Sequence, residues 1–206
     1  MYTFPFSTCE KPNNKGIAQP YSSIINLSIV FLLLYFLFQS KSAILKYVFF
    51  SFILFELWHT ISHMTFIEGY IQQNVVHFLA YNIAFGTLLA FLYLSKSSLN
   101  FYQILILIIV VIFDIIVFIL YGGVYIILSG TLLFITILFC LYNKYPKFVL
   151  YYIYALLGLA LLFINEAINC ERMLKIWPEF PFHIIIEIYG FILFYMLGNK
   201  LLSLEK

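Results

Sequence analysis

Apolar stretches of about 20 residues recur along almost the whole chain, and they constrain its fold more than any other feature. A helix needs about 20 apolar residues to cross a hydrocarbon core. Hydrophobic residues make up 64% of the 206 residues and charged residues only 10%, which is unsuited to a soluble domain. The sequence therefore predicts an all-α, polytopic membrane protein, a bundle of seven transmembrane helices. The expected spans are Pro20–Phe38, Ser42–Ile67, Val75–Leu94, Phe101–Tyr121, Val124–Tyr142, Lys147–Ile168 and Phe180–Leu202.

The organisation predicted around these spans is simple. Residues 1–19 are polar and lack the apolar core of a cleavable signal, so we expect a short N-terminal segment followed by one membrane domain over residues 20–206. Most lysines lie in the connections on the side of the C-terminus. Because basic residues favour the cytosolic side, we predict a lumenal or extracellular N-terminus and a cytosolic C-terminus, in an endomembrane such as ER or Golgi if the host is eukaryotic.

All four histidines fall where expected spans cross one edge of the membrane. His59 and His63 lie near the end of the second span, His77 at the start of the third and His183 near the start of the last. The up-and-down connectivity brings these three span ends to the same side. The sequence therefore predicts a cluster of imidazoles at one depth, and a metal site is the first hypothesis.

The spacing of polar residues within the spans supports a metal site. Glu56, His59 and His63 are spaced i, i+3, i+7 and share one helical stripe, while His183 and Glu187 are spaced i, i+4. Ionisable residues within membrane helices are costly and are functional candidates by default. Imidazole and carboxylate are suitable zinc ligands, and two histidines with one glutamate form a known catalytic set. We predict that His63, His183 and Glu187 bind zinc, with His59 and His77 as acid/base groups or further ligands.

Other interpretations of these polar residues stay open. A single histidine in a membrane helix is more often an interhelical hydrogen-bond partner. Glu56 and Glu166 are expected to support the site from behind or to be structural, and Asp114 to bond a neighbouring helix. Haem ligation between His63 and His183 is a further hypothesis, which needs a wide apolar slot between facing histidines.

Several blocks of sequence point to one family. They are Cys9-Glu10, the stretch Ile17–Leu27 at the entry to the first span, His63-Met64-Thr65, Asn165–Glu171, and His183 followed by Tyr189 and Gly190. In order and spacing these blocks resemble the alkaline ceramidases, within the wider CREST superfamily of seven-helix membrane hydrolases. The resemblance implies an intramembrane, metal-dependent hydrolase of an acyl lipid amide, with a membrane lipid such as ceramide as its partner and no nucleic acid.

Three positions depart from the family pattern. His59 stands where the family has a serine, Glu187 where it has a second histidine on the last helix, and His77 nearest to its aspartate on the third helix. At all three positions the residue can still bind a metal. This favours a site with altered ligands over an inactive one. The resemblance then implies His77 as the base and His59 as an oxyanion-stabilising group or fourth ligand. A noncatalytic sensor or structural protein that binds a metal or lipid on the same scaffold is the alternative.

The resemblance has two implications for the N-terminal segment. It implies a disulfide between Cys9 and Cys170, which both lie on the predicted outer side. It also places the family's calcium site on this segment, but Ser7 and Gln19 replace acidic groups there and only Glu10 remains. Calcium prefers several anionic oxygens, so we expect calcium binding to be weak or absent.

Overall fold

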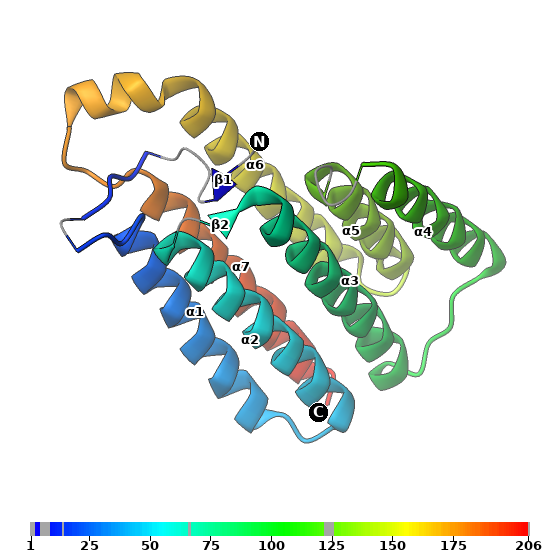
Figure 1. Ribbon diagram of the computed structural model, residues 1–206. Coiled ribbons are helices and arrows are strands. Elements are labelled where there is room, and N and C mark those ends of the chain that lie inside the picture. The colour runs from blue at the N-terminus through cyan, green and yellow to red at the C-terminus, as the bar shows by residue number, and fades with distance from the viewer. Residues whose placement is uncertain (1–2, 5–8, 14, 66, 122–125, 206) are drawn as a thin grey trace.

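The computed structural model describes residues 3–4, 9–13, 15–65, 67–121 and 126–205 and consists of seven helices and one very short strand pair (Figure 1). Six helices in this described part are long and apolar enough to cross a membrane, and α5 adds a shorter apolar stretch. The predicted all-α, seven-helix architecture is therefore confirmed. The helices are α1 Pro20–Gln39, α2 Ala43–Met64, α3 Gly69–Leu94, α4 Phe101–Tyr121, α5 Ile126–Tyr142, α6 Pro146–Ile176 and α7 His183–Ser203, and the antiparallel strands are β1 Thr3–Phe4 and β2 Ile67–Glu68.

Four predicted helix ends were wrong, including the start of α7, which is at His183 and not at Phe180. Helix α2 ends at Met64 because Thr65 is extended, with φ −126° and ψ 154°, and the chain then pairs with β1. Helix α3 begins at Gly69, and α6 continues to Ile176 through the expected loop. The apolar pattern marks only the part of a helix that suits hydrocarbon. A polar helical extension can continue past that part into water, where its side chains are solvated.

The buried apolar core draws residues from all seven helices, and α1 packs closely against both α2 and α7. Phe36 of α1 is fully buried and stacks on Phe49 of α2, with ring centroids 5.5 Å apart. On the other side of Phe36, Gly198 of α7 leaves room for the ring, since a Cβ there would overlap it. A small residue thus allows two helices to approach closely, as is common between membrane helices.

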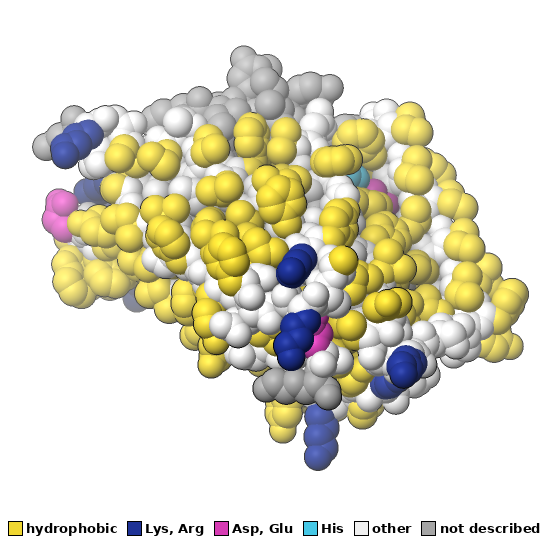
Figure 2. All heavy atoms as spheres, turned by 90° about the horizontal axis from the view of Figure 1, so that it is seen from below, with side chains coloured by type: hydrophobic (Ala, Val, Ile, Leu, Met, Phe, Trp, Pro, Cys, Tyr) yellow, Lys and Arg dark blue, Asp and Glu magenta, His cyan; other side chains and the backbone are white. Residues whose placement is uncertain are grey.

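The outer surface is rich in large apolar side chains. Figure 2 shows hydrophobic side chains over most of the visible face, with Lys and Arg in a few places. Helix α4 buries Gln103, Val110 and Asp114, while Ile119 is 73% exposed. Apolar surface of this extent is far larger than soluble monomers tolerate. Such a surface is consistent with a multi-pass membrane protein, as are the six helices long and apolar enough to cross a bilayer.

The N-terminal segment crosses the ends of α2, α6 and α7. The amide of Gln19 donates to the carbonyl of His63 at 2.9 Å, and the amide of Phe182 donates to the carbonyl of Cys9 at 3.0 Å. A disulfide joins Cys9 to Cys170 on α6, with an S–S distance of 2.07 Å. The implied disulfide is therefore confirmed, and it fastens the segment over one end of the bundle.

Candidate metal centre

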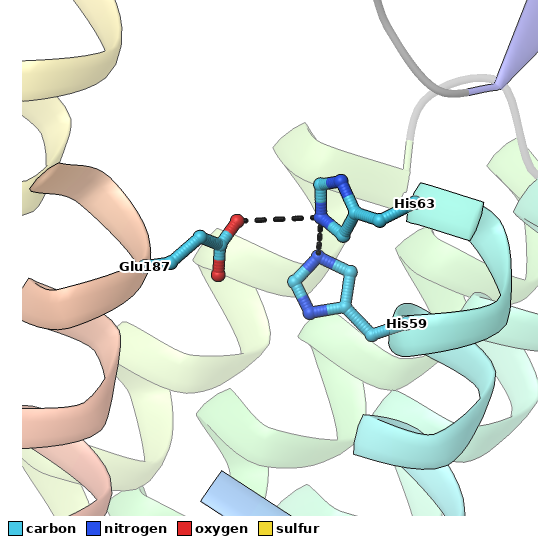
Figure 3. Close-up of side chains that lie close together, drawn as sticks. All are labelled: His59, His63 and Glu187. Atoms are coloured by element: carbon cyan, nitrogen blue, oxygen red, sulfur yellow. Dashed lines mark hydrogen bonds and ion pairs between the residues drawn. The ribbon is translucent and has the colours of Figure 1, made fainter. Parts of the chain in front are cut away.

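The last turns of α2 and the first turns of α7 place three imidazoles around one carboxylate oxygen. The Nε2 atoms of His63 and His183 lie 3.3 Å and 3.0 Å from Oε1 of Glu187. The Nε2 atom of His59 lies 3.0 Å from Nε2 of His63 (Figure 3). His63, His183 and Glu187 are buried, while the side chain of His59 is 33% exposed. Of the four histidines predicted to gather at this edge, three, His59, His63 and His183, lie beside Glu187.

The Nδ1 atom of each of these histidines faces a separate oxygen. His63 Nδ1 contacts Oε1 of Gln19, which precedes α1. His59 Nδ1 lies 3.4 Å from Glu56, one turn earlier on α2. His183 Nδ1 lies 2.8 Å from Oε2 of Glu166 on α6, and a carboxylate or amide oxygen accepts from an N–H. These contacts favour the tautomers with hydrogen on Nδ1, leaving the Nε2 lone pairs directed at the centre.

This arrangement concentrates acceptors at one point. With Nδ1 protonated in each ring, His59, His63 and His183 present lone pairs near the carboxylate of Glu187, an acceptor itself. Acceptor atoms 3.0 to 3.3 Å apart repel one another unless a proton or a cation lies among them. Oriented imidazoles with oxygen partners behind them are the usual surroundings of a metal ion in a protein.

Three of these residues form a group that could hold a metal ion. His59, His63 and Glu187 each offer one ligand atom, and these atoms all lie within 4.8 Å of one another. Bonds of about 2.0–2.1 Å in tetrahedral geometry place neighbouring ligand atoms about 3.3 Å apart, close to the observed separations. The compact group and the predicted set of His63, His183 and Glu187 share two members. His59 completes the compact group, and His183 contacts the same oxygen of Glu187.

His77 has different neighbours. Its Nε2 lies 2.9 Å from Oδ2 of Asp114 on α4, and its ring contacts those of Tyr81 and Phe118. Within the described ranges, no hydrogen bond, ion pair or ring contact joins His77 to the centre around Glu187. The expectation that Asp114 bonds a neighbouring helix is confirmed, and the role of His77 as the base at the metal stays a prediction.

Two supporting acids were predicted and one supporting residue was missed. Glu56 and Glu166 lie behind His59 and His183, as expected of acids that orient ligands. Gln19 was considered only for calcium, and its contact with His63 was not foreseen. The one available signal was its position directly before α1, at the same membrane edge as His63. A sequence pattern that reports helix faces says nothing about a contact made by a loop.

The haem hypothesis does not fit this geometry. Oε1 of Glu187 lies within 3.3 Å of Nε2 of His63 and within 3.0 Å of Nε2 of His183. The carboxylate therefore occupies the space that a porphyrin iron between the two imidazoles would need. The wide apolar slot on which the hypothesis depended is replaced by a polar contact.

The residues considered for calcium have other partners. The carboxylate of Glu10 accepts from the amides of Tyr21 and Ser22 at 2.6 Å and 3.2 Å and so caps α1. Gln19 contacts His63, and Ser7 lies outside the described residues. A helix N-terminus carries partial positive charge, so Glu10 stabilises α1 in this position. The expectation of weak or absent calcium binding stays a prediction.

Comparisons with protein-family models, with characterised proteins and with solved structures find no match to this chain.

Proposed function

We propose that this protein is a metal-dependent hydrolase of an acyl lipid amide, similar in chemistry to the alkaline ceramidases. One observation carries the proposal: the three imidazoles of His59, His63 and His183 converge on Glu187, each with its Nδ1 already bonded to an oxygen. Such buried polar density is costly in a membrane protein and marks a functional site. Zinc is the metal that this ligand chemistry favours.

Each residue has a distinct role in the proposed reaction. His59, His63 and Glu187 would hold the ion, which when bound acidifies a water molecule and polarises the scissile carbonyl. His183 would accept the proton of the attacking water through Nε2. Glu166, 2.8 Å from Nδ1 of His183, would keep that ring oriented and stabilise its protonated form. This assignment exchanges two roles predicted from sequence, where His183 binds the metal and His59 acts in catalysis.

The substrate class follows from the surroundings and the resemblance. The centre lies at one end of helices whose exposed surfaces are apolar and suited to contact with lipid, so the substrate would enter laterally from the bilayer. A ceramide or another N-acyl lipid is the proposed substrate, since the resemblance is to enzymes that cleave such amides. The disulfide at this end of the bundle favours an oxidising compartment. A lumenal or extracellular position of the centre and the N-terminus is therefore part of the proposal.

The alternative is a noncatalytic metal-binding protein on the same scaffold. The observation that favours it is that four donors surround the centre, since His183 contacts Glu187 at 3.0 Å. Four protein ligands close a tetrahedral zinc site and make it structural, whereas three ligands leave a position for water. The number of protein ligands therefore distinguishes the enzyme from the binder.

The experiment measures metal content and lipid turnover in the same preparations. Wild type purified without chelator should contain one zinc per chain, and Glu187→Gln should be depleted. Glu171→Gln on exposed α6 is the matched control and should retain the metal. Metal-replete wild type should release fatty acid from a panel of ceramides and N-acyl lipids. Stoichiometric metal without lipid turnover supports the noncatalytic metal-binding protein. Wild type without stoichiometric metal refutes both the hydrolase and the metal-binding protein.

A further inference from the structure

A second polar site lies in a cavity between α3 and α4. The cavity has a volume of about 490 Å³, within the range of small-molecule pockets. Side chains of both helices line it, together with Tyr47 of α2. Figure 2 shows a histidine and an acidic side chain together in a recess of the hydrophobic surface. The lining is mostly apolar, so its few polar groups define what it can bind.

Three of the cavity-lining residues form one polar group. The Tyr81 hydroxyl interacts with the carboxylate of Asp114, and Nδ1 of His77 has no hydrogen-bond partner. His77 is 8% exposed and Asp114 is 1% exposed, so water at the protein surface does not satisfy these atoms. A buried polar group without a partner costs free energy, so Nδ1 of His77 calls for a bound group that completes its hydrogen bonding.

The chemistry of these atoms selects the ligand. In the neutral ring, Nε2–H of His77 donates to Oδ2 of Asp114 at 2.9 Å, and Nδ1 of His77 is then an acceptor beside the anionic carboxylate. The Tyr81 hydroxyl can donate or accept. A group that binds here must therefore donate hydrogen bonds, as an alcohol or an amine does. A fatty-acid carboxylate would bring a further acceptor against Asp114 and would be repelled.

The rest of the cavity suits an aliphatic chain. Phe78, Phe85, Leu89, Val111 and Ile115 supply apolar walls, and at a separate point Tyr47 and Asn82 are bonded to each other at 3.0 Å. We propose that this cavity binds a single-chain lipid with an alcohol or amine head, held by His77, Asp114 and Tyr81. The site uses none of the residues around Glu187, so the proposal does not depend on the hydrolase function.

The test uses photoactivatable 16-carbon probes that differ only in the head: an alcohol, an amine and a carboxylic acid. Each is cross-linked to the purified protein in phosphatidylcholine nanodiscs, and labelled peptides are mapped by mass spectrometry. The alcohol, the amine or both should label α3 and α4 about tenfold more than the acid, since a hydrogen bond to a charged group is at stake. Stronger labelling by the amine would identify a cationic head that neutralises Asp114.

Matched variants decide whether labelling reports this cavity. Asp114→Asn and Tyr81→Phe should each lower labelling of α3 and α4, and Tyr81→Phe serves if Asp114→Asn fails to fold. Ile115→Phe should block the cavity. Ile116→Phe is its control, because Ile116 is 49% exposed against 48% for Ile115 but does not line the cavity. Equal labelling by the acid, or labelling that Ile115→Phe and Tyr81→Phe leave unchanged, overturns the proposal.

Discussion

Two glycines on α7 provide a sharp test of how α1 and α7 pack. At Gly198 an added Cβ would overlap the ring of Phe36, whereas at Gly190 it would meet no atom within 4 Å. Phe36 is fully buried and stacked on Phe49, so its ring has no free space to move into. Gly198→Ala and Gly190→Ala therefore add the same methyl group to the same helix with opposite steric outcomes.

The magnitude follows from two opposing effects. Replacing glycine by alanine inside a helix stabilises it by about 0.8–1.0 kcal/mol, and both variants gain this. Overpacking a filled core costs about 1–3 kcal/mol, and only Gly198→Ala pays it. The difference between the variants is thus about 1–3 kcal/mol. For a domain of this size that corresponds to a melting temperature roughly 2–12 °C lower for Gly198→Ala than for Gly190→Ala.

The assay is thermal unfolding of both variants and wild type in the same detergent, followed by circular dichroism. Wild type should melt between the two variants or close to Gly198→Ala, because Gly190→Ala gains helix stability without an overpacking cost. If Gly198→Ala melts at or above Gly190→Ala, the close approach of α7 to Phe36 is refuted. Because α7 carries Glu187, that result would also weaken the geometry on which the metal centre depends.

Three further predictions test the site and the chain ends. His59→Ala should lose the metal. His183→Ala should keep the metal and lower kcat/KM about 10²–10⁴-fold, because a general base is removed. Metal loss in His183→Ala would show that His183 is a ligand. Replacing Cys9 and Cys170 with serine should lower the free energy of unfolding by about 2–5 kcal/mol, measured by denaturant titration, and an unchanged value would show that the bond contributes no stability. Partial burial acts to raise the pKa of Glu205, but amide hydrogen bonds from Lys41 and Ser42 outweigh this effect and lower that pKa. Wild type should therefore be more stable than Glu205→Gln above pH 4.5, and this difference should vanish as the pH falls below that value. A stability difference that persists in acid contradicts the contact.

The helical periodicity and the long apolar stretches were sufficient to predict seven helices and the end of the bundle at which the histidines gather. This part of the fold is local, because the length of an apolar stretch and the alternation of direction between successive spans determine it. The same reasoning put Glu56 on one stripe with His59 and His63 through their i, i+3, i+7 spacing, while for Glu166 it predicted only a supporting or structural acid. The disulfide between Cys9 and Cys170 came from the family resemblance, and the fold agrees with it.

The partners within that end were decided by tertiary structure alone. The sequence predicted His77 at the same depth as His63, yet His63 lies at the end of α2 and His77 more than two turns into α3. There His77 bonds Asp114, because α3 turns that face toward α4 and the apolar pattern does not specify the direction of a side chain. Gln19 reaches His63 only because the N-terminal segment crosses the ends of α2 and α7. Depth along a membrane helix is a one-dimensional property that sequence records, whereas the rotation of each helix and the path of a loop depend on packing against every neighbour at once.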